Sequence, residues 1–449
     1  MIKDFCKDLI LGFNWDKMKT EALYKHYLQS TGVSTDTRKI EKGNIFFALK
    51  GPNFNANDFA VQALETGASL VVVDEERVIP SGDSRYFLVD DVLLALQKLA
   101  NHHRRQLTIP IIGLTGSNGK TTSKELLHAV LKKKFKTSAT VGNLNNHIGV
   151  PLTLLSIPKD TEIAIIEMGA NKQGDIQELC EIAEPTHGFI TNIGKAHLEG
   201  MGGPEGVLKT KTELFQHLRA NKGTVFINSQ DPILSNMAKR FENPILYPAK
   251  GDFCEVTFVG ANPFVKFKVE GDDTVHLSSL IGAYNFGNIA TALTVGKFFG
   301  VPMEQAVDAV VNYKPSNMRS QLLEKRSNLI ILDAYNANPS SMEVAIQTFG
   351  QMTGKKYKMV ILGDMYELGD STEEEHRKLG ELVARYNFDK ICFTGKHIQA
   401  ALEKAPIRSL YFPDPFSFRN WLQDSKLEDH LILIKGSRGM KLEGLVDFI

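Results

Sequence analysis

The chain has 449 residues, which at roughly 150 residues per domain suggests about three domains. Apolar residues make up 43% of the chain and aromatic residues 9%, enough to build packed cores, so wholesale disorder is excluded. Basic and acidic residues number 52 each, and the formal charge is therefore zero. This balance argues against a dedicated binder of nucleic acid or anionic membranes, but it leaves room for a local pocket that takes an anionic small molecule.

No apolar run approaches the roughly 18 to 20 residues that a membrane span needs. The N-terminal segment 1–18 mixes acids and bases among its apolar residues, which is not typical of a signal peptide. The four cysteines are far apart and form no Cys-x-x-Cys pair, so they indicate neither a zinc ribbon nor a disulfide framework: Cys6, Cys180, Cys254 and Cys392. We therefore expect a cytoplasmic protein with reduced thiols.

Strand and helix patterns alternate along the chain. Residues 1–107 predict strands at 45–49 and 70–73, a helix near 58–65, and a second helix from Asp91, which is placed to cap it. From residue 109 the order is apolar strand, glycine-rich turn and amphipathic helix, followed by strand runs at 163–167, 188–192 and 225–228. This alternation predicts a mostly parallel sheet covered by helices.

Two further patterns follow. Residues 251–280 alternate polar and apolar side chains with period two, which indicates antiparallel strands. After Pro315 the strand–helix alternation restarts, with helices expected from Pro339 and Thr372, and this favours a second, smaller doubly wound domain. The predicted class is α/β with three domains, at 1–107, 108–315 and 316–449.

A phosphate-binding turn is predicted at TGSNGKTT, residues 115–122, between an apolar strand and a helix. Glycines there let the backbone turn its N–H groups toward an anion. Lys120 would reach the β- and γ-phosphates, and the Thr121 hydroxyl would ligate Mg²⁺. The usual spacing wants glycine at 114, where this chain has Leu114. We predict a nucleoside triphosphate site formed by Gly116, Ser117, Asn118, Gly119, Lys120, Thr121 and Thr122.

Other polar residues have open interpretations from their positions alone. Glu167 ends the apolar run IAIIE, where a carboxylate could hold Mg²⁺ or simply cap a helix. A lone His197 is more often structural, and the spacing around Lys211 is typical of a surface helix. The turn containing Lys435, Ser437 and Arg438 fits a substrate carboxylate and a plain surface loop equally well.

The loop sequence TGSNGKTT resembles the ATP loop of the Mur ligases and their folylpolyglutamate synthetase relatives. Further motifs of that family follow in order over nearly the whole chain: NLNNHIGVPLTLL at 143–155, EMGANKQGDI at 167–176, NIGKAHLEGMGGPEGVLKTKTELF at 192–215, GAYNFGNIATA at 282–292, DAYNANPSSM at 333–342, GDMYELGDSTEEEHRKLGE at 363–381 and KGSRGMKLE at 435–443. At the front, STDTRKIEKGNIFFALKGPNF at 34–54 resembles the uridine-binding domain of the family.

This resemblance implies an N-terminal UDP-sugar-binding domain, a central P-loop ATPase, and a C-terminal Rossmann-like domain that closes over the nucleotide. It implies that ATP and two Mg²⁺ ions serve a ligation in which UDP-N-acetylmuramoyl-tripeptide becomes an acyl phosphate and the amino group of D-alanyl-D-alanine attacks it. We expect a monomer in peptidoglycan synthesis, without nucleic-acid partners. The alternatives are a sister ligase that adds one amino acid to a UDP-muramoyl or folyl acceptor, and a scaffold that binds ATP without catalysis.

The resemblance also implies residue roles. The implied catalytic residues are Lys120, Asn145, Asn146, His197, Lys211 and Arg319. Metal binding falls to Thr121, Glu167, His197 and Lys211, the last as a carbamate. Beyond the loop, the nucleotide would contact Asn285 and Asn288 on the adenine side, Arg319 at the γ-phosphate, and Asp333 at the ribose with Tyr335 and Asn336 beside it. Ser34, Thr35, Asp36 and Arg38 match the UDP-sugar motif.

Three positions depart from the family pattern, and their roles stay open. His147 stands where an acid is usual, and Tyr284 stands where histidine is common. The sequence Asn55-Ala56-Asn57 replaces an Asp-x-His motif. An Asn-capped helix start is an alternative role for the Asn285 segment. Because the substrates are anionic and the net charge is zero, we expect the balancing cations to be concentrated at Arg38, Lys120 and Arg319, with the rest of the surface unbiased or slightly acidic.

Overall fold

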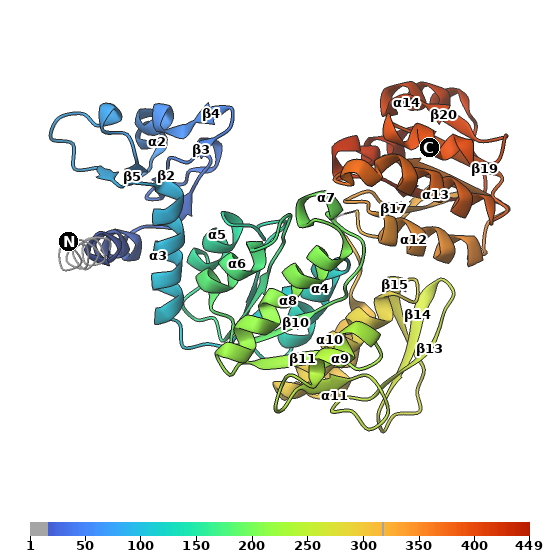
Figure 1. The fold of residues 1–449 in the computed structure, drawn as a ribbon, viewed down its shortest axis with the longest axis horizontal. Helices are drawn as coiled ribbons and strands as arrows, with labels where there is room; N and C mark the ends of the chain where they lie inside the picture. The colour runs from blue at the N-terminus through green and yellow to red at the C-terminus, as the bar shows by residue number, and fades with distance from the viewer. Residues whose placement is uncertain (1–16, 317) are drawn as a thin grey trace. The chain divides into compact units, whose positions relative to one another are not determined.

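The computed structural model describes residues 17–316 and 318–449 (Figure 1). The chain divides into two compact units. One comprises the residues up to Gly113 together with Lys136–Gly169 and Asp175–His187; the other comprises Leu114–Phe135, Ala170–Gly174 and Gly188–Ile449. Cys6, and most of the segment that the sequence distinguishes from a signal peptide, lie outside the described residues.

The N-terminal part is built on a parallel sheet of order β1-β2-β5-β6, with strands Val33–Ser34, Ile45–Phe47, Leu70–Val73 and Tyr86–Leu88. Ala60 and Ala63 of α2 (Ala60–Thr66) join Phe46 and Val71 in one core. The predicted cap is confirmed, since Asp91 accepts a 2.8 Å hydrogen bond from the Leu94 N–H at the start of α3 (Val92–Gln106). The remaining elements are a helix over 17–29, η1 (Thr37–Lys39), β3 (Lys50–Gly51), β4 (Phe54–Asn55), η2 (Ala56–Phe59) and η3 (Glu76–Val78).

The central sheet has the order β12-β11-β10-β7-β9-β8, with strands Ile245–Tyr247, Thr224–Asn228, His187–Ile190, Ile111–Thr115, Ile163–Glu167 and Thr137–Ala139. The runs in β7 and β9 are buried at every position, as expected where helices cover both faces of a sheet. Its helices are α4 (Lys120–Leu131), α5 (Gly149–Leu155), α6 (Asp175–Ala183), α7 (Leu198–Met201), α8 (Pro204–Ala220), α9 (Pro232–Ala238), α10 (Asn285–Phe298) and α11 (Met303–Asn312).

The period-two segment forms a three-stranded antiparallel sheet of β13 (Val256–Ala261), β14 (Phe264–Val269) and β15 (His276–Ile281), as predicted. The C-terminal sheet has the order β16-β17-β21-β18-β19-β20, and only β16 runs antiparallel to its neighbour. Its strands are Gln321–Lys325, Asn328–Asp333, His430–Lys435, Tyr357–Gly363, Lys390–Thr394 and Leu410–Phe412.

Successive residues of β18 pack alternately into two hydrophobic cores of this C-terminal part. Val360 and Leu362 pack in one core, while Met359 and Ile361 pack in the other, because successive strand residues point to opposite faces. Helices α12 and α13 begin at Pro339 and Thr372, the residues predicted from the sequence, and lie beside the sheet in Figure 1. Helices and 3-10 turns cover it: α12 (Pro339–Gln351), η4 (Gly369–Ser371), α13 (Thr372–Ala384), η5 (His397–Glu403), α14 (Pro415–Asp424), η6 (Arg438–Met440) and η7 (Leu442–Phe448). The α/β class is confirmed.

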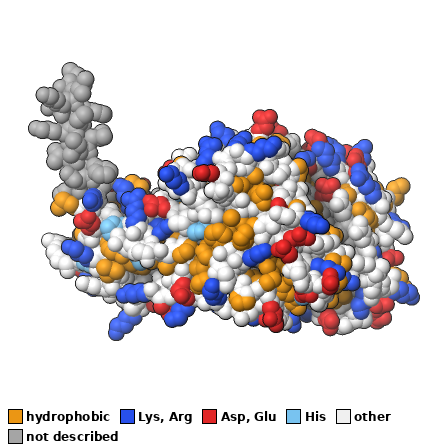
Figure 2. All heavy atoms as spheres, turned by 90° about the horizontal axis from the view of Figure 1, so that it is seen from below, with side chains coloured by type: hydrophobic (Ala, Val, Ile, Leu, Met, Phe, Trp, Pro, Cys, Tyr) orange, Lys and Arg blue, Asp and Glu red, His pale blue; other side chains and the backbone are white. Residues whose placement is uncertain are grey.

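The surface charges and the state of the cysteines agree with the expectations from the composition. Figure 2 shows basic and acidic side chains interspersed over one face of the molecule. Cys180, Cys254 and Cys392 are buried, and none of them forms a disulfide with another described residue. In the part of the chain that the structure describes, no helix has both the length and the apolar character needed to cross a bilayer.

Candidate active site

Two glycines set the backbone of the predicted phosphate loop. β7 ends at Thr115 and α4 begins at Lys120, so the loop is the short turn between them. Gly116 and Gly119 have φ values of 147° and 77°, a region that side chains disfavour. A Cβ on Gly116 would lie 1.9 Å from the Thr191 hydroxyl oxygen, and one on Gly119 would lie 2.7 Å from Asn288 Oδ1. Both positions therefore need glycine for conformation and for space.

The segment after β10 supports this loop. The N–H groups of Ser117 and Asn118 donate to Asn192, to its carbonyl at 3.0 Å and its side-chain oxygen at 3.1 Å. The Thr191 hydroxyl donates to the Asn118 carbonyl at 2.6 Å. Sequence reasoning missed Thr191 and Asn192, although the predicted strand 188–192 should have placed its carboxyl end at the same sheet edge. These contacts hold the loop in one conformation before any ligand binds.

Lys120 lies against the loop that it follows. Its ammonium donates to the Gly116 carbonyl at 2.6 Å and to the Ser117 carbonyl at 3.4 Å. Thr121 is buried at the start of α4. The first N–H groups of a helix have no acceptor within the helix, and they favour an anion. The lysine, the helix start and the curled loop together can hold a phosphate chain.

Asn285 and Asn288 are buried and bonded to protein. Asn288 Oδ1 accepts from the Ser123 hydroxyl at 2.9 Å, which ties α10 to α4, and its amide nitrogen donates to Asn285 Oδ1 at 2.8 Å. Asn285 in turn donates to the Ile281 carbonyl at 2.8 Å. Helix α10 begins at Asn285 and has no side-chain cap, so the Asn-capped start is wrong. In this structure both amides bond to protein groups, and through Ser123 they hold α10 against the helix that follows the phosphate loop.

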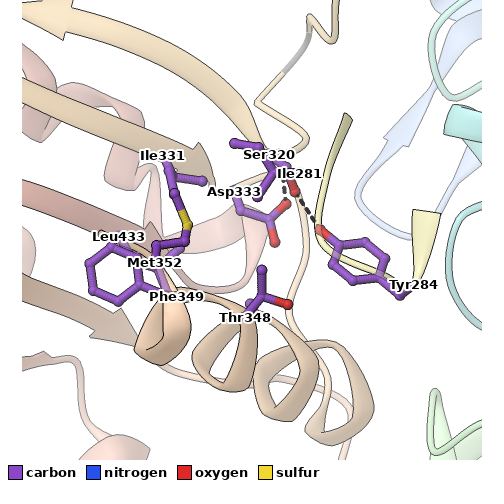
Figure 3. Close-up of a pocket in the computed structure, with 10 residues that line it drawn as sticks. Ile281, Tyr284, Ser320, Ile331, Asp333, Thr348, Phe349, Met352 and Leu433 are labelled. Atoms are coloured by element: carbon purple, nitrogen blue, oxygen red, sulfur yellow. Dashed lines mark hydrogen bonds between the residues drawn. The ribbon is translucent and has the colours of Figure 1, made fainter. Parts of the chain in front are cut away.

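A pocket lies at the carboxyl end of β17 (Figure 3), with Asp333 as its one carboxylate among apolar and hydroxyl-bearing side chains. Asp333 accepts from the Ser320 N–H at 3.1 Å and from the Lys435 ammonium at 2.6 Å. The Tyr284 hydroxyl is 2.8 Å from the Ser320 hydroxyl. The pocket is lined by Ile281, Tyr284, Ser320, Ile331, Asp333, Ala345, Thr348, Phe349, Met352 and Leu433. Asp333 thus provides a hydrogen-bond acceptor at this strand end, the kind of group to which a ribose hydroxyl can donate.

The turn after β21 is not a plain surface loop. Lys435 and Ser437 are each only 2% exposed, and Ser437 accepts a 3.0 Å bond from the Tyr366 N–H. The Arg438 guanidinium pairs with Glu443 at 2.8 Å. The Lys435 charge is therefore balanced by Asp333 rather than left for a substrate carboxylate.

Glu167 ends β9 as a buried carboxylate, 1% exposed, and accepts from the Asn145 amide at 2.9 Å. The Thr140 hydroxyl accepts from the Glu167 N–H at 2.9 Å. Asn146 is used differently, since its side-chain oxygen accepts from the N–H groups of Ile148 and Gly149 at the start of α5. Asn145 thus lies with the carboxylate, whereas the Asn146 oxygen organises a helix start.

His197 directly precedes α7, and Lys211 lies within α8. His197 has φ 51° and its ring pairs with Glu367, whose φ is also left-handed at 63°. The hydrogen bond from His197 lowers the pKa of the Glu367 carboxyl. Lys211 is fully buried in α8, so the surface-helix interpretation is wrong. Sequence reasoning gave Glu367 no role, because its partner is 170 positions away by the residue numbers.

Hard oxygen donors are present for Mg²⁺. The Thr121 hydroxyl and the Glu167 carboxylate are the ligand types that this ion prefers, and a buried carboxylate is stabilised by a cation. Within residues 17–316 and 318–449, no three His, Cys, Asp or Glu side chains form a preassembled metal cluster. A bound phosphate chain would supply the remaining oxygens, as it commonly does for Mg²⁺.

Comparison with known proteins agrees with this geometry. The chain matches the Mur ligase family, catalytic domain over residues 29–104, the Mur ligase middle domain over 114–296, and the Mur ligase, glutamate ligase domain over 318–438. It is 35% identical over 422 residues, 92% of each chain, to the UDP-N-acetylmuramoyl-tripeptide–D-alanyl-D-alanine ligase of Bacillus subtilis. The chain belongs to the Mur ligase family.

Two solved structures of this family resemble the whole chain. The crystal structure of MurF from Acinetobacter baumannii is 32% identical with a TM-score of 0.82, covering 92% of each chain. The MurF ligase of Thermotoga maritima, solved in complex with ADP, is 28% identical with a TM-score of 0.81, covering 94% of this chain and 97% of that one. The three-domain architecture of a Mur ligase, predicted from the sequence motifs, is therefore confirmed, while the residue boundaries near 108 and 315 stay predictions.

The Mur ligase motif at residues 34–38 forms a self-contained turn. The Ser34 hydroxyl donates to the Asp36 carbonyl at 3.0 Å, and Asp36 accepts from the Arg38 guanidinium at 2.9 and 2.8 Å. The Arg38 bonds lower the pKa of the Asp36 carboxyl to about 2. Arg38, one of the positions where we expect cations to be concentrated, is paired with Asp36, which balances its charge in this structure. Nothing in these contacts distinguishes a role for Thr35.

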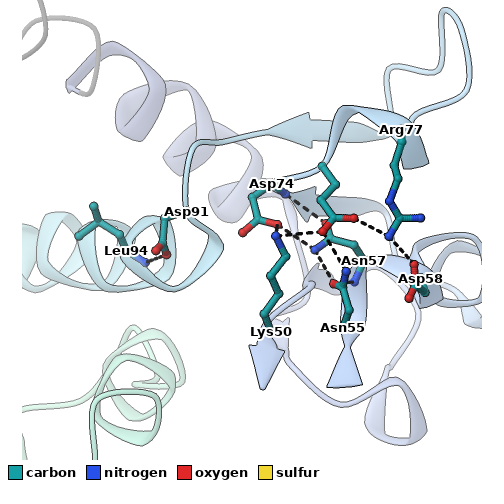
Figure 4. Close-up of polar contacts among 9 residues, drawn as sticks. Lys50, Asn55, Asn57, Asp58, Asp74, Arg77, Asp91 and Leu94 are labelled. Carbon is teal, nitrogen blue, oxygen red and sulfur yellow. Dashed lines mark hydrogen bonds and ion pairs between the residues drawn. The ribbon is translucent and has the colours of Figure 1, made fainter. Parts of the chain in front are cut away.

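Asn55 and Asn57, where the Mur ligase pattern has Asp-x-His, belong to a network of polar side chains (Figure 4). Asn57 is 1% exposed, and its amide nitrogen donates to Asp74 at 2.8 Å and to Asn55 at 2.9 Å. The Asp74 N–H donates back to Asn57 Oδ1 at 3.2 Å. Lys50 bridges Asp74 and Glu75 at 3.0 Å each. The pair of amides therefore fastens the end of β5 to the loop after β4.

We predict that Asn57→Ala destabilises this part of the chain. The Asp74 N–H would lose its acceptor, and the Asp74 carboxylate would lose the Asn57 amide while keeping Lys50; a buried group left without its partner costs about 1–3 kcal/mol. Amide hydrogen exchange should accelerate in residues 70–74, and the midpoint of thermal unfolding should fall. The exposed Asn53→Ala is the matched control. Unchanged exchange with a raised KM for a UDP-tripeptide would instead mean that Asn57 contacts the UDP-sugar.

Proposed function

We propose that this chain is the ATP-dependent ligase that joins D-alanyl-D-alanine to UDP-N-acetylmuramoyl-tripeptide, giving the pentapeptide precursor of peptidoglycan. The observation that carries the proposal is the 35% identity to the Bacillus subtilis enzyme of that activity over 92% of both chains. The glycine-constrained loop with Lys120 at the start of α4 supports the ATP requirement independently.

ATP binds with its phosphates on the loop of residues 116–122 and its nucleoside in the pocket beside Asp333. The ADP complex of the Thermotoga maritima relative supports nucleotide binding. Asp333 already holds Lys435, so its carboxylate accepts ribose hydroxyl hydrogens from a fixed position. Asn285 and Asn288 act behind the loop in this account, keeping α10 against α4.

The chain's own side chains stabilise charge during the transfer. The terminal carboxylate of the tripeptide attacks the γ-phosphorus and ADP leaves, which gives an acyl phosphate. The amino group of D-alanyl-D-alanine then attacks the acyl carbon, and the tetrahedral intermediate loses the amine proton and expels inorganic phosphate to give the amide. Lys120 and Arg319 are the fixed cations for the oxygens of the transferring phosphoryl group. Asn145 donates an uncharged hydrogen bond near Glu167, which orients groups there without adding charge.

Metal binding completes the proposal. Thr121, Glu167 and His197, with Lys211 as a carbamate, are the residues that would hold two Mg²⁺ ions. When bound, these ions neutralise phosphate charge and polarise the phosphoryl oxygens. The pairing of His197 with Glu367 fixes its ring orientation, since a carboxylate on one ring nitrogen leaves the other for a ligand.

The domain assignment follows from the same account. Residues 1–107 bind the UDP-sugar through Ser34, Thr35, Asp36 and Arg38, residues 108–315 bind ATP, and residues 316–449 close over the nucleotide. Because its precursors are nucleotide-linked, we place the reaction in the cytoplasm, and we propose that the enzyme acts as a monomer.

The decisive test is the substrate dependence of phosphate release. With ATP and Mg²⁺, we expect phosphate only when a UDP-tripeptide and D-alanyl-D-alanine are both present, and mass spectrometry should find the pentapeptide. Running the assay with the lysine and the diaminopimelate tripeptide in turn identifies the acceptor. Phosphate release that is indifferent to either substrate contradicts the proposal.

The second candidate is a sister ligase that adds a single amino acid. The sequences DAYNANPSSM and NLNNHIG favour the dipeptide-adding enzyme through their resemblance to it. Replacing D-alanyl-D-alanine with single amino acids in the same assay separates the two. Product formed faster from one amino acid than from the dipeptide would favour the sister enzyme.

A further inference from the structure

The ring of Tyr335 carries the side chain of Arg319. The guanidinium carbon lies 3.9 Å from the ring centroid, well within the distance of a cation–π contact. Tyr335 lies two residues beyond the end of β17, and its N–H donates to the Met318 carbonyl at 3.3 Å. The backbone bond and the stacked ring therefore hold the segment carrying Arg319 at the carboxyl end of this strand.

Arg319 is a cation without a carboxylate partner among the described residues. No Asp or Glu oxygen lies within 4.0 Å of its nitrogens there, and its buried Nε has no hydrogen-bond acceptor. Arg438 offers the contrast, since it also faces the Tyr335 ring, at 6.0 Å, but is paired with Glu443 at 2.8 Å. Of the two guanidiniums near the Tyr335 ring, that of Arg438 is neutralised by a carboxylate, whereas that of Arg319 can pair with an anionic ligand.

The backbone on both sides of Arg319 is fixed in an unusual conformation. Met318 and Ser320 have φ values of 57° and 49°, which non-glycine residues seldom adopt unless their surroundings impose them. Ser320 is held by Asp333, which accepts its N–H at 3.1 Å, in the nucleoside pocket. The strand end that lines the pocket thus also determines where Arg319 lies.

We propose that Tyr335 is a positioning residue for Arg319: its ring face orients the guanidinium so that the N–H edge is left for the terminal phosphoryl group. This inference rests on the proposed function, in which Arg319 meets the γ-phosphate. It assigns Tyr335 a task other than the contact beside the ribose that the sequence motif implies. The aromatic face is required, and the hydroxyl is not.

Nucleotide affinity tests the proposal without turnover. Wild type, Tyr335→Phe and Tyr335→Leu are compared by calorimetry with ADP and with a non-hydrolysable ATP analogue, both with Mg²⁺. We expect Tyr335→Leu to bind ADP within twofold of wild type, because ADP lacks the γ-phosphate. Its affinity for the analogue should fall about tenfold, and Tyr335→Phe should match wild type.

Steady-state kinetics adds a second readout. Tyr335→Leu should lower kcat about tenfold with the KM for ATP changed less, and in the Arg319→Ala background it should cause no further loss. Equal affinity of Tyr335→Leu and wild type for the analogue overturns the proposal. A parallel loss of ADP affinity means that Tyr335 contacts the nucleoside, and a loss in Tyr335→Phe means that the hydroxyl matters; either result overturns it as well. If wild type shows no ligation, the proposed function fails, and the affinity comparison still decides the role of Tyr335.

Discussion

Replacing Lys120 with alanine should lower kcat for ATP-dependent ligation by about 100- to 1,000-fold, the range for removing one preorganised donor from a charge-stabilising site. In the structure the Lys120 ammonium lies against the loop carbonyls of Gly116 and Ser117, where phosphate oxygens would replace one of these bonds. Water cannot take over this role, because it is neither fixed in position nor charged. Phosphate release with both acceptor substrates present measures the effect.

The exposed Lys132, at the other end of α4, provides the matched control. Lys132→Ala removes the same charge from the same helix and should leave kcat within twofold of wild type. Both variants should unfold at the wild-type temperature, since the Lys120 side chain is only partly buried. A Lys120→Ala enzyme that still turns over ATP at the wild-type rate would mean that the loop has been misread.

Local signals predicted the secondary structure because the causes are local. The run at 163–167 reads as a buried strand, and Asp91 reads as a cap because a carboxylate satisfies a free N–H at a helix start. The phosphate loop could be found for the same reason. Its eight consecutive residues form a recognisable motif, and Gly116 and Gly119 are needed there because their φ values are positive. Family motifs then supplied the domain architecture.

The tertiary contacts of the site could not be predicted from these local signals. Asn118 Oδ1 accepts a 2.9 Å bond from the Asn338 amide across 220 positions, and the partner of its N–H, Asn192, is 74 positions away. Asn288 could face either the ligand or the protein from its place on α10, and packing against Ser123 decides the direction. Sequence spacing fixes the helix on which a side chain lies, whereas its neighbours determine where it points.

The net charge is counted from the composition, whereas the partner of each cation is set by the folded chain. We expected the balancing cations to be concentrated at Arg38, Lys120 and Arg319, and the structure pairs Arg38 with Asp36 two residues away. This ion pair does not change the net charge of the chain, but it balances one of the cations that could otherwise bind an anionic substrate. Arg319 has no described carboxylate within 4.0 Å, and its charge is not balanced in this way.

The burial of Lys211 is the basis for predicting a large loss of activity when this residue is replaced. The residue is fully buried within α8, whereas Lys209, two positions earlier, is exposed. An ammonium inside a protein is costly unless it is compensated, and two Mg²⁺ ions nearby would repel it. Reaction of the neutral amine with CO₂ gives a carbamate, an anion whose oxygens are suited to Mg²⁺. We therefore predict that Lys211 takes the proposed metal role as a carbamate.

Lys211→Ala should therefore lose at least about 100-fold in kcat, the scale for removing a fixed charge from such a site. Short carboxylic acids such as formate or acetate should restore part of the activity, because the shortened side chain leaves room for a carboxylate in place of the carbamate. Lys211→Arg should be inactive and should not respond, since arginine fills the space and stays cationic. Lys209→Ala is the control and should keep wild-type kcat. Full activity of Lys211→Ala without added acid would exclude the carbamate, and inactivity that no acid relieves, together with a lowered unfolding temperature, would assign Lys211 to the core of α8 instead.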